Sequence, residues 1–170
     1  MRMRALTTLA CISLLMLILS GCATVGGKVT RRPAPEFTVE LVGGGTASLS
    51  EFRGRPLVLG MGATWCPHCM HEAPIFRRVY DRYKDRVGMM GILVKSPAKD
   101  AEALVRKNSL DFKIGLDPDE RVKKSFGATG IPTTYFIDKD GYIVDENFGG
   151  MEEDELAEKI ERLTAGQPPM

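Results

Sequence analysis

Two cysteines separated by two residues follow an apolar run, and this arrangement constrains the fold more than any other feature of the chain. The run Leu57–Met61 is typical of a strand that is buried on both faces. A helical pattern over Met70–Arg86 comes after the cysteines, and Pro74 predicts a kink in it. A cysteine at a helix N-terminus lies near unpaired N–H groups, which stabilise a thiolate. We therefore predict Cys66 as a nucleophile and the more buried Cys69 as the thiol that resolves its mixed disulfide.

Other uses of a Cys-x-x-Cys pair compete with this interpretation. A structural zinc site needs a second pair of ligands, and His68 and His71 lie in the same helical turn as the cysteines. A purely structural disulfide over so short a loop constrains little of the unfolded chain. A copper(I)-binding module that also uses Met61 and Met70 stays open, although methionines equally fill protein cores. We expect no metal at the site.

Of four residues next to the cysteines, three are candidates for supporting roles, and each of these three has an ordinary alternative. Trp65 is either part of a docking surface or a packing residue. A charged His68 between the cysteines would favour the thiolate, or it is an exposed residue with no role. His71 fits helix surface. Glu72, three residues after Cys69, is either a proton acceptor for that thiol or a solvated acid.

The remaining patterns alternate between strands and helices. Strands are predicted over Phe37–Val42, Thr46–Leu49, Val87–Lys95, Phe112–Leu116, Ile131–Ile137 and Tyr142–Val144. Helices are predicted over Pro97–Lys107, from Asp117 to about Phe126, and over Met151–Leu163. For the second of these, Asp117 is the expected N-cap, Pro118 lies in the first turn and Gly127 ends the helix. The pattern predicts an α/β fold: a central mixed sheet with helices on both faces, led by a β-hairpin.

Length and charge narrow the classes of function. The 170 residues suit one domain after a short leader, and we place that domain at 35–164, with a disordered tail at 165–170. The chain has 23 Lys and Arg against 22 Asp and Glu, with no basic stripe among aromatic residues. Nucleic acid is therefore not an expected partner.

The N-terminus has the layout of an export signal. Two arginines precede an apolar stretch over Ala5–Leu19, which is too short for a comfortable transmembrane span. The segment Leu19–Cys22 resembles the lipobox of bacterial lipoproteins, which implies a signal peptide at 1–21 and lipidation of Cys22, while Cys11 leaves with the leader. A plain secretory signal or an uncleaved anchor is the alternative. Residues 22–34 are predicted to form a flexible tether that places the domain in the bacterial cell envelope.

The segment Trp65–Cys69, the proline Pro74 and the segment Gly130–Thr133 together resemble the thioredoxin superfamily. The resemblance is to its TlpA-like or redoxin (ResA-like) branch of tethered thiol-disulfide oxidoreductases, and it runs from about Pro35 to Leu163. It implies a thioredoxin-like fold in which the helix after Pro97 and the strand near Phe112 form a central insertion.

The resemblance also implies roles for single residues. Cys66 is the exposed nucleophile, and Cys69 is the resolving thiol. Glu72 stands at the position of an active-site acid. An X-Pro bond is trans by default, but the resemblance implies a cis Pro132 that shapes a substrate groove together with Ile131. Pro67 belongs to the motif that tunes the thiolate.

Two departures from the family pattern concern the redox chemistry. Gly60 stands where thioredoxin has a buried Asp, within the run Gly60–Ala63 that replaces an Asn-Phe-Trp-Ala-like segment. The pair Pro67-His68 is the pair of the oxidant DsbA. Thioredoxin and DsbA have reduction potentials of about −270 and about −120 mV, so the two departures leave the direction of electron flow open.

These features together predict a lipid-anchored reductase of protein disulfides without a cofactor. Its substrates would be extracytoplasmic thiol proteins, for instance in cytochrome c maturation, and a membrane electron donor of the DsbD/CcdA type would re-reduce it. The first alternative is a DsbA-like oxidant. A peroxidase is disfavoured because Thr64 lies only two residues before Cys66, whereas peroxiredoxins have a Thr-x-x-Cys spacing.

Overall fold

The computed structural model describes residues 31–167, so the predictions for the leader, for Cys11 and Cys22 and for most of the tether lie outside the described residues. Within them, eight strands form one mixed sheet in the order β1-β8-β7-β4-β5-β6-β2-β3. The strands are β1 (Arg32–Pro33), β2 (Thr38–Leu41), β3 (Thr46–Ser48), β4 (Leu57–Gly62), β5 (Gly88–Val94), β6 (Lys113–Asp117), β7 (Thr133–Ile137) and β8 (Tyr142–Phe148). The helices are η1 (Leu49–Phe52), α2 (Pro67–Tyr83), α3 (Ala98–Asn108), α4 (Arg121–Phe126) and α5 (Glu153–Thr164). No helix in this part of the chain is long and apolar enough to cross a membrane.

The apolar run that precedes the cysteines forms the central strand, as predicted. β4 pairs in parallel with β5 on one side and antiparallel with β7 on the other. Its side chains at Val58, Leu59 and Met61 are almost fully buried. The unit β4–α2–β5 is therefore the predicted βαβ unit, and its helix begins where β4 ends.

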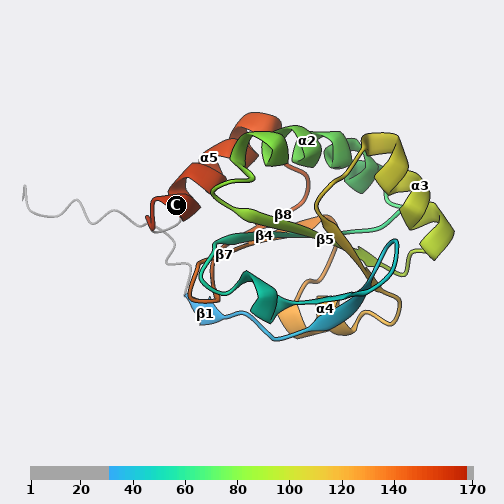
Figure 1. Ribbon diagram of the computed structural model, residues 1–170, viewed down its shortest axis with the longest axis horizontal. Helices are drawn as coiled ribbons and strands as arrows, with labels where there is room; N and C mark the ends of the chain where they lie inside the picture. The colour runs from blue at the N-terminus through green and yellow to red at the C-terminus, as the bar shows by residue number, and fades with distance from the viewer. Residues whose placement is uncertain (1–30, 168–170) are drawn as a thin grey trace, which may run out of the picture.

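Helices cover both faces of the sheet, as predicted (Figure 1). On one face, α2 and α5 pack over Val58 and Phe136, and α3 lies beside α2 over Leu93. On the other face, α4 and the segment leading to β2 enclose a second core cluster that includes Leu59 and Met61. Because neighbouring side chains of β4 enter different clusters, the strand is covered on both sides.

The sheet begins earlier than the sequence pattern indicates. Arg32 and Pro33 fall in the predicted tether, yet they form β1 and pair antiparallel with Tyr142 and Ile143. The Arg32 guanidinium donates to a Glu146 carboxylate oxygen at 2.8 Å, so a contact between distant parts of the chain holds this segment in place. The hairpin of β2 and β3 follows as predicted.

Several helix boundaries differ from the predictions by one to four residues, and two of these differences have a clear physical reason. α2 begins at Pro67 rather than Met70, because proline without an N–H suits the first helical position. α4 begins at Arg121, so Asp117 is not the adjacent N-cap that its sequence predicts. Instead, the buried Asp117 carboxylate reaches across an intervening turn and accepts hydrogen bonds from the backbone N–H groups of Val122 and Lys123, at 3.2 and 2.9 Å. The helix ends at Gly127 as predicted.

Candidate active site

The two cysteines lie at the N-terminus of α2 and are joined in a disulfide. Cys66 is the N-cap residue, and its Sγ accepts a hydrogen bond from the backbone N–H of Cys69 at 3.2 Å. Its sulfur therefore lies where unpaired helix N–H groups favour a negative charge. This placement has two causes. β4 ends before the turn at Thr64 and Trp65, and Pro67 begins the helix directly after Cys66.

The expected difference in exposure between the cysteines is wrong for this disulfide-bonded form. Cys66 is 6% exposed and Cys69 is 7% exposed. The physical reason is that Ile131 packs against the cluster that both cysteines form with Ala63. Access to the Cys66 sulfur by another protein therefore depends on the segment that carries Ile131.

That segment contains the predicted cis-proline. The Ile131–Pro132 peptide bond is cis, as the family resemblance implies. The backbone N–H of Gly149 donates to the Pro132 carbonyl at 2.9 Å, and the Thr133 hydroxyl donates to the Gly130 carbonyl at 2.9 Å. These contacts tie the proline loop both to its own strand and to the end of β8.

Glu72 is buried, so the interpretation of this residue as a solvated acid is wrong. Its Oε1 accepts a hydrogen bond from the backbone N–H of Met151 at 2.7 Å. Burial raises the pKa of Glu72 to about 7, the nearby Glu155 adds to the increase, and the Met151 hydrogen bond opposes it. A carboxyl group with such a pKa can take up or release a proton near neutral pH.

A small cavity of about 70 Å³ connects Glu72 to the redox pair, because Glu72, Cys69 and Pro132 all line it. The rest of its lining is mostly apolar, which is consistent with the high pKa of the acid. Gly60 also lines it, and a Cβ at this position would lie 3.1 Å from Cε1 of Phe76. The Phe76 ring thus occupies the place to which a side chain at Gly60, such as the Asp of thioredoxin, would point.

Two large hydrophobic side chains are strongly exposed within the described residues, and both belong to segments of the site. Trp65, 59% exposed, precedes Cys66, and its indole N–H donates to the Lys95 carbonyl at 3.1 Å. Phe148, 57% exposed, pairs in register with Thr133, which follows the cis-proline. The exposure of Trp65 is inconsistent with a packing role. The sequence pattern does not indicate Phe148, because it predicts a strand that ends at Val144, although the glycines at 149 and 150 mark the end of β8.

The remaining candidates have simpler surroundings. His68 and His71 are both exposed on α2, which agrees with the surface position expected of His71. Met61 is buried in the core, so it fills the core and is not available to a copper ion. Among residues 31–167, no three His, Cys, Asp or Glu side chains are grouped as metal ligands would be.

Known proteins support the same chemistry. The chain is 29% identical to the thiol-disulfide oxidoreductase ResA of Bacillus thuringiensis over 135 residues, which cover 78% of each chain. It is 29% identical to the solved MTB dsbF, with a TM-score of 0.70 over 75% of this chain and 94% of that one. A secreted Mycobacterium tuberculosis disulfide oxidoreductase homologous to E. coli DsbE is 25% identical, with a TM-score of 0.67 over 75% and 96% of the chains.

The fold and the cysteine pair now agree with these comparisons. A Cys66–Cys69 disulfide at a helix N-terminus can exchange with an external thiol pair, and the relatives are thiol-disulfide oxidoreductases. The protein is accordingly a thiol-disulfide oxidoreductase of the ResA and DsbE type with a thioredoxin-like fold. The AhpC/TSA family model matches residues 30–146, and the chain belongs to this family.

Proposed function

We propose that the protein is a membrane-anchored, extracytoplasmic reductase that passes electrons from Cys66 and Cys69 to protein disulfides. The observation that carries this proposal is the buried acid Glu72 on the cavity that Cys69 lines. A carboxylate near the resolving cysteine disfavours the thiolate form and so destabilises the reduced pair relative to the disulfide. A dithiol destabilised in this way donates electrons more readily, as a reductase requires.

The proposed reaction starts from the dithiol. The Cys66 thiolate attacks one sulfur of the substrate disulfide, forms a mixed disulfide and releases the other sulfur as a thiolate, which takes a proton from water. Cys69 then transfers its proton to Glu72, directly or through a water molecule in the cavity, and attacks the Cys66 sulfur. The second substrate thiolate leaves, and two electrons have passed to the substrate while Cys66 and Cys69 become a disulfide.

The site's other residues have supporting roles in this proposal. Trp65, Ile131 and Pro132 line the approach to the disulfide and contact the substrate chain, since Trp65 is exposed and Ile131 covers the cysteines. Pro67 and His68 in the first turn of α2 set the stability of the Cys66 thiolate.

The anchor and the electron source are part of the same proposal. The leader at 1–21 is cleaved and Cys22 is acylated, which tethers the domain at 35–164 to the membrane. A membrane donor of the DsbD/CcdA type re-reduces the disulfide, and the substrates are extracytoplasmic proteins such as those of cytochrome c maturation. A Cys22→Ser variant should lose incorporation of labelled palmitate and leave the membrane fraction. A Cys22→Ser variant that still incorporates label would overturn this part.

The direction of electron flow is tested by the reduction potential of the Cys66–Cys69 pair, measured against glutathione and dithiothreitol buffers. A reductase should lie near the thioredoxin value of about −270 mV. Glu72→Gln should raise the potential at a pH above 7, because it removes the negative charge beside the dithiol. Glu158→Gln makes the same change of charge at an exposed position on α5 and should leave the potential unchanged. An equal shift in both variants would show that the cavity acid has no special effect.

A DsbA-like oxidant is the second candidate, and His68 is the observation that favours it. This residue lies between the cysteines in the first turn of α2, where a positive charge would stabilise the Cys66 thiolate and with it the reduced form. A potential near −120 mV would select the oxidant. The absence of any reversible dithiol couple would contradict both candidates.

A further inference from the structure

A turn from another part of the chain holds the turn that precedes Cys66. Lys95 and Ser96 are the first two of the three residues that link β5 to α3, and they contact Trp65 and Thr64 directly. The Ser96 hydroxyl oxygen accepts a hydrogen bond from the Thr64 backbone N–H at 3.0 Å, and the Lys95 carbonyl accepts one from the Trp65 indole N–H at 3.1 Å. Both residues immediately before the N-cap cysteine therefore depend on this turn for a hydrogen bond.

The turn itself is held in an uncommon conformation. Lys95 has a φ of 45°, which lies in the left-handed region that lysine rarely adopts. Its backbone N–H donates to the Asp117 carbonyl at 3.1 Å, and its ammonium group pairs with Glu120 at 2.7 Å. Contacts with Lys95 and Lys123 hold the pKa of Glu120 at about 2, so this acid stays charged at neutral pH. These contacts fix the direction in which the Lys95 carbonyl points.

Ser96 connects the fixed turn at Lys95 to the turn that precedes Cys66. Its hydroxyl donates to the Val94 carbonyl at 3.1 Å, which leaves its oxygen lone pairs toward the Thr64 N–H. Two residues further on, the Cys66 backbone N–H donates to the Ala63 carbonyl at 3.2 Å and closes the turn. A shift at Thr64 would therefore move the Cys66 sulfur relative to the helix N–H of Cys69, with which it makes its hydrogen bond.

We propose that Ser96 is a positioning residue that, through the Thr64 N–H, holds Cys66 in the geometry for thiol-disulfide exchange. Ser96 touches neither the substrate nor the cysteines and acts only through the turn. Attack by Cys66 on a substrate and attack on Cys66 by a thiol need the same sulfur position. The inference therefore concerns the oxidoreductase site and does not rest on the proposed direction of electron flow.

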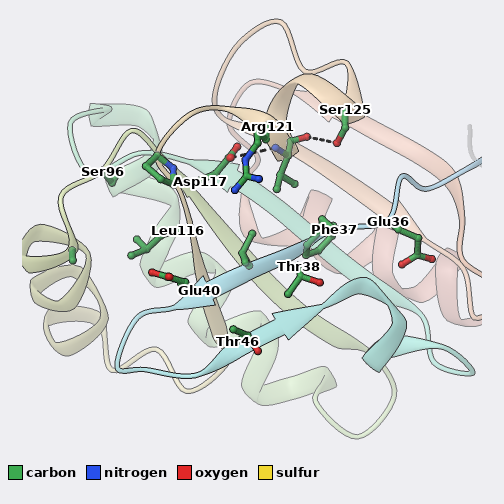
Figure 2. A pocket seen from close by; sticks show the side chains of 14 residues that line it. Glu36, Phe37, Thr38, Glu40, Thr46, Ser96, Leu116, Asp117, Arg121 and Ser125 are labelled. Atoms are coloured by element: carbon green, nitrogen blue, oxygen red, sulfur yellow. Dashed lines mark hydrogen bonds between the residues drawn. The ribbon is translucent and has the colours of Figure 1, made fainter.

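The structure offers a matched pair of variants at this position. Ser96 lines an open groove of about 720 Å³ between β2, β6 and α4, shown in Figure 2. Ser96→Thr keeps the hydroxyl, and Ser96→Val has the same shape without it. Ser125 lines the same groove, and its hydroxyl donates to the Val122 carbonyl within α4, away from the cysteines. Ser125→Ala is therefore the control for loss of a serine hydroxyl.

The experiment measures alkylation of Cys66 by iodoacetamide in the reduced protein across a range of pH, with the site assigned by mass spectrometry. Ser96→Val should slow alkylation at neutral pH by roughly two- to tenfold, the factor that corresponds to the net strength of one hydrogen bond. It should also change the emission of Trp65, which is the single tryptophan of the chain. Ser96→Thr and Ser125→Ala should both match the wild type.

Wild-type alkylation and emission in Ser96→Val would overturn the inference, and so would equal defects in the Thr and Val variants. Circular dichroism and thermal unfolding establish that each variant is folded. If Ser96→Val does not fold, Ser96→Ala takes its place with the same expected result. This experiment compares alkylation rates between variants, whereas the reductase proposal is tested by a reduction potential. A negative result for Ser96 would therefore leave the reductase proposal standing.

Discussion

The carboxylate of Glu72 accepts a hydrogen bond from the backbone N–H of Met151 at 2.7 Å, which links the active-site helix α2 to the segment before α5. Met151 is itself buried, so this contact lies inside the protein. A single N–H donor does not replace the water that surrounds an exposed carboxylate. The acid is therefore held in a place that favours its protonated form, and this has a consequence for stability.

We expect the free energy of unfolding to fall as the pH rises from 4.5 to about 7, the ordinary and the folded pKa of Glu72. In this window the folded protein retains a proton that the unfolded chain has released, so stability is lost with rising pH. The full difference corresponds to about 3 kcal/mol. Glu72→Gln keeps an oxygen that accepts from Met151 and should be more stable than the wild type above pH 7.

Urea unfolding at pH 5 and at pH 8.5 tests this expectation. The gain in stability of Glu72→Gln over the wild type should be larger at the higher pH. The matched variant Glu158→Gln, at an exposed position on α5, should show no such dependence. A gain that does not change with pH would mean that Glu72 is ionised in the folded protein at both values.

The order of the two cysteines in the reaction gives a second prediction. Cys69→Ser should accumulate a mixed disulfide between Cys66 and the substrate, because no second thiol resolves it. Cys66→Ser should form none, because its remaining thiol lies one turn inside α2 and is not at the helix N-terminus. Non-reducing gels after incubation of the reduced variants with protein substrates that carry intact disulfides, followed by acid quenching, report both outcomes. Adducts on Cys69 in Cys66→Ser at the same rate would reverse the assignment.

Gly60 gives a third prediction, about the packing of the cavity that it lines together with Cys69 and Glu72. A Cβ at this position would lie 3.1 Å from the Phe76 ring, so Gly60→Ala should overpack the core and cost about 1–3 kcal/mol. Gly130→Ala is the control, since nothing lies within 4 Å of a Cβ there, and it should change stability by less than about 0.5 kcal/mol. Thermal or urea unfolding compares the two. Equal effects would mean that the ring of Phe76 moves aside freely.

Local patterns in the sequence were sufficient for most of the fold and for the centre of the site. The run Leu57–Met61 is apolar at every position except Gly60, and Pro67 follows Cys66, so a buried strand and a helix start could be identified from neighbouring residues. The cis bond at Pro132 required the family resemblance, because an X-Pro bond is trans by default.

Contacts between distant residues explain what the sequence did not reveal. Arg32 joins the sheet through Glu146, which is 114 residues away, and Glu72 meets Met151 across 79 residues. No local pattern contains such pairs, so the tether is predicted too long, and the sequence leaves open whether Glu72 is a proton acceptor or a solvated acid. Nor does a pattern show that Ile131 covers Cys66, since the two approach only when β4 and β7 pair.

Asp117 gives the last prediction, because the sequence pattern predicts an adjacent N-cap residue and the structure shows that this residue acts across a turn. Its buried carboxylate accepts N–H groups from Val122 and Lys123 across the turn before α4. Asp117→Ala leaves these donors without their acceptor and should cost about 1–3 kcal/mol. Asp119→Ala removes an exposed acid that pairs with Arg121 at the surface, and it should change stability by less than about 0.5 kcal/mol. Urea unfolding of both variants checks this difference, and equal effects would show that Asp117 does not cap α4.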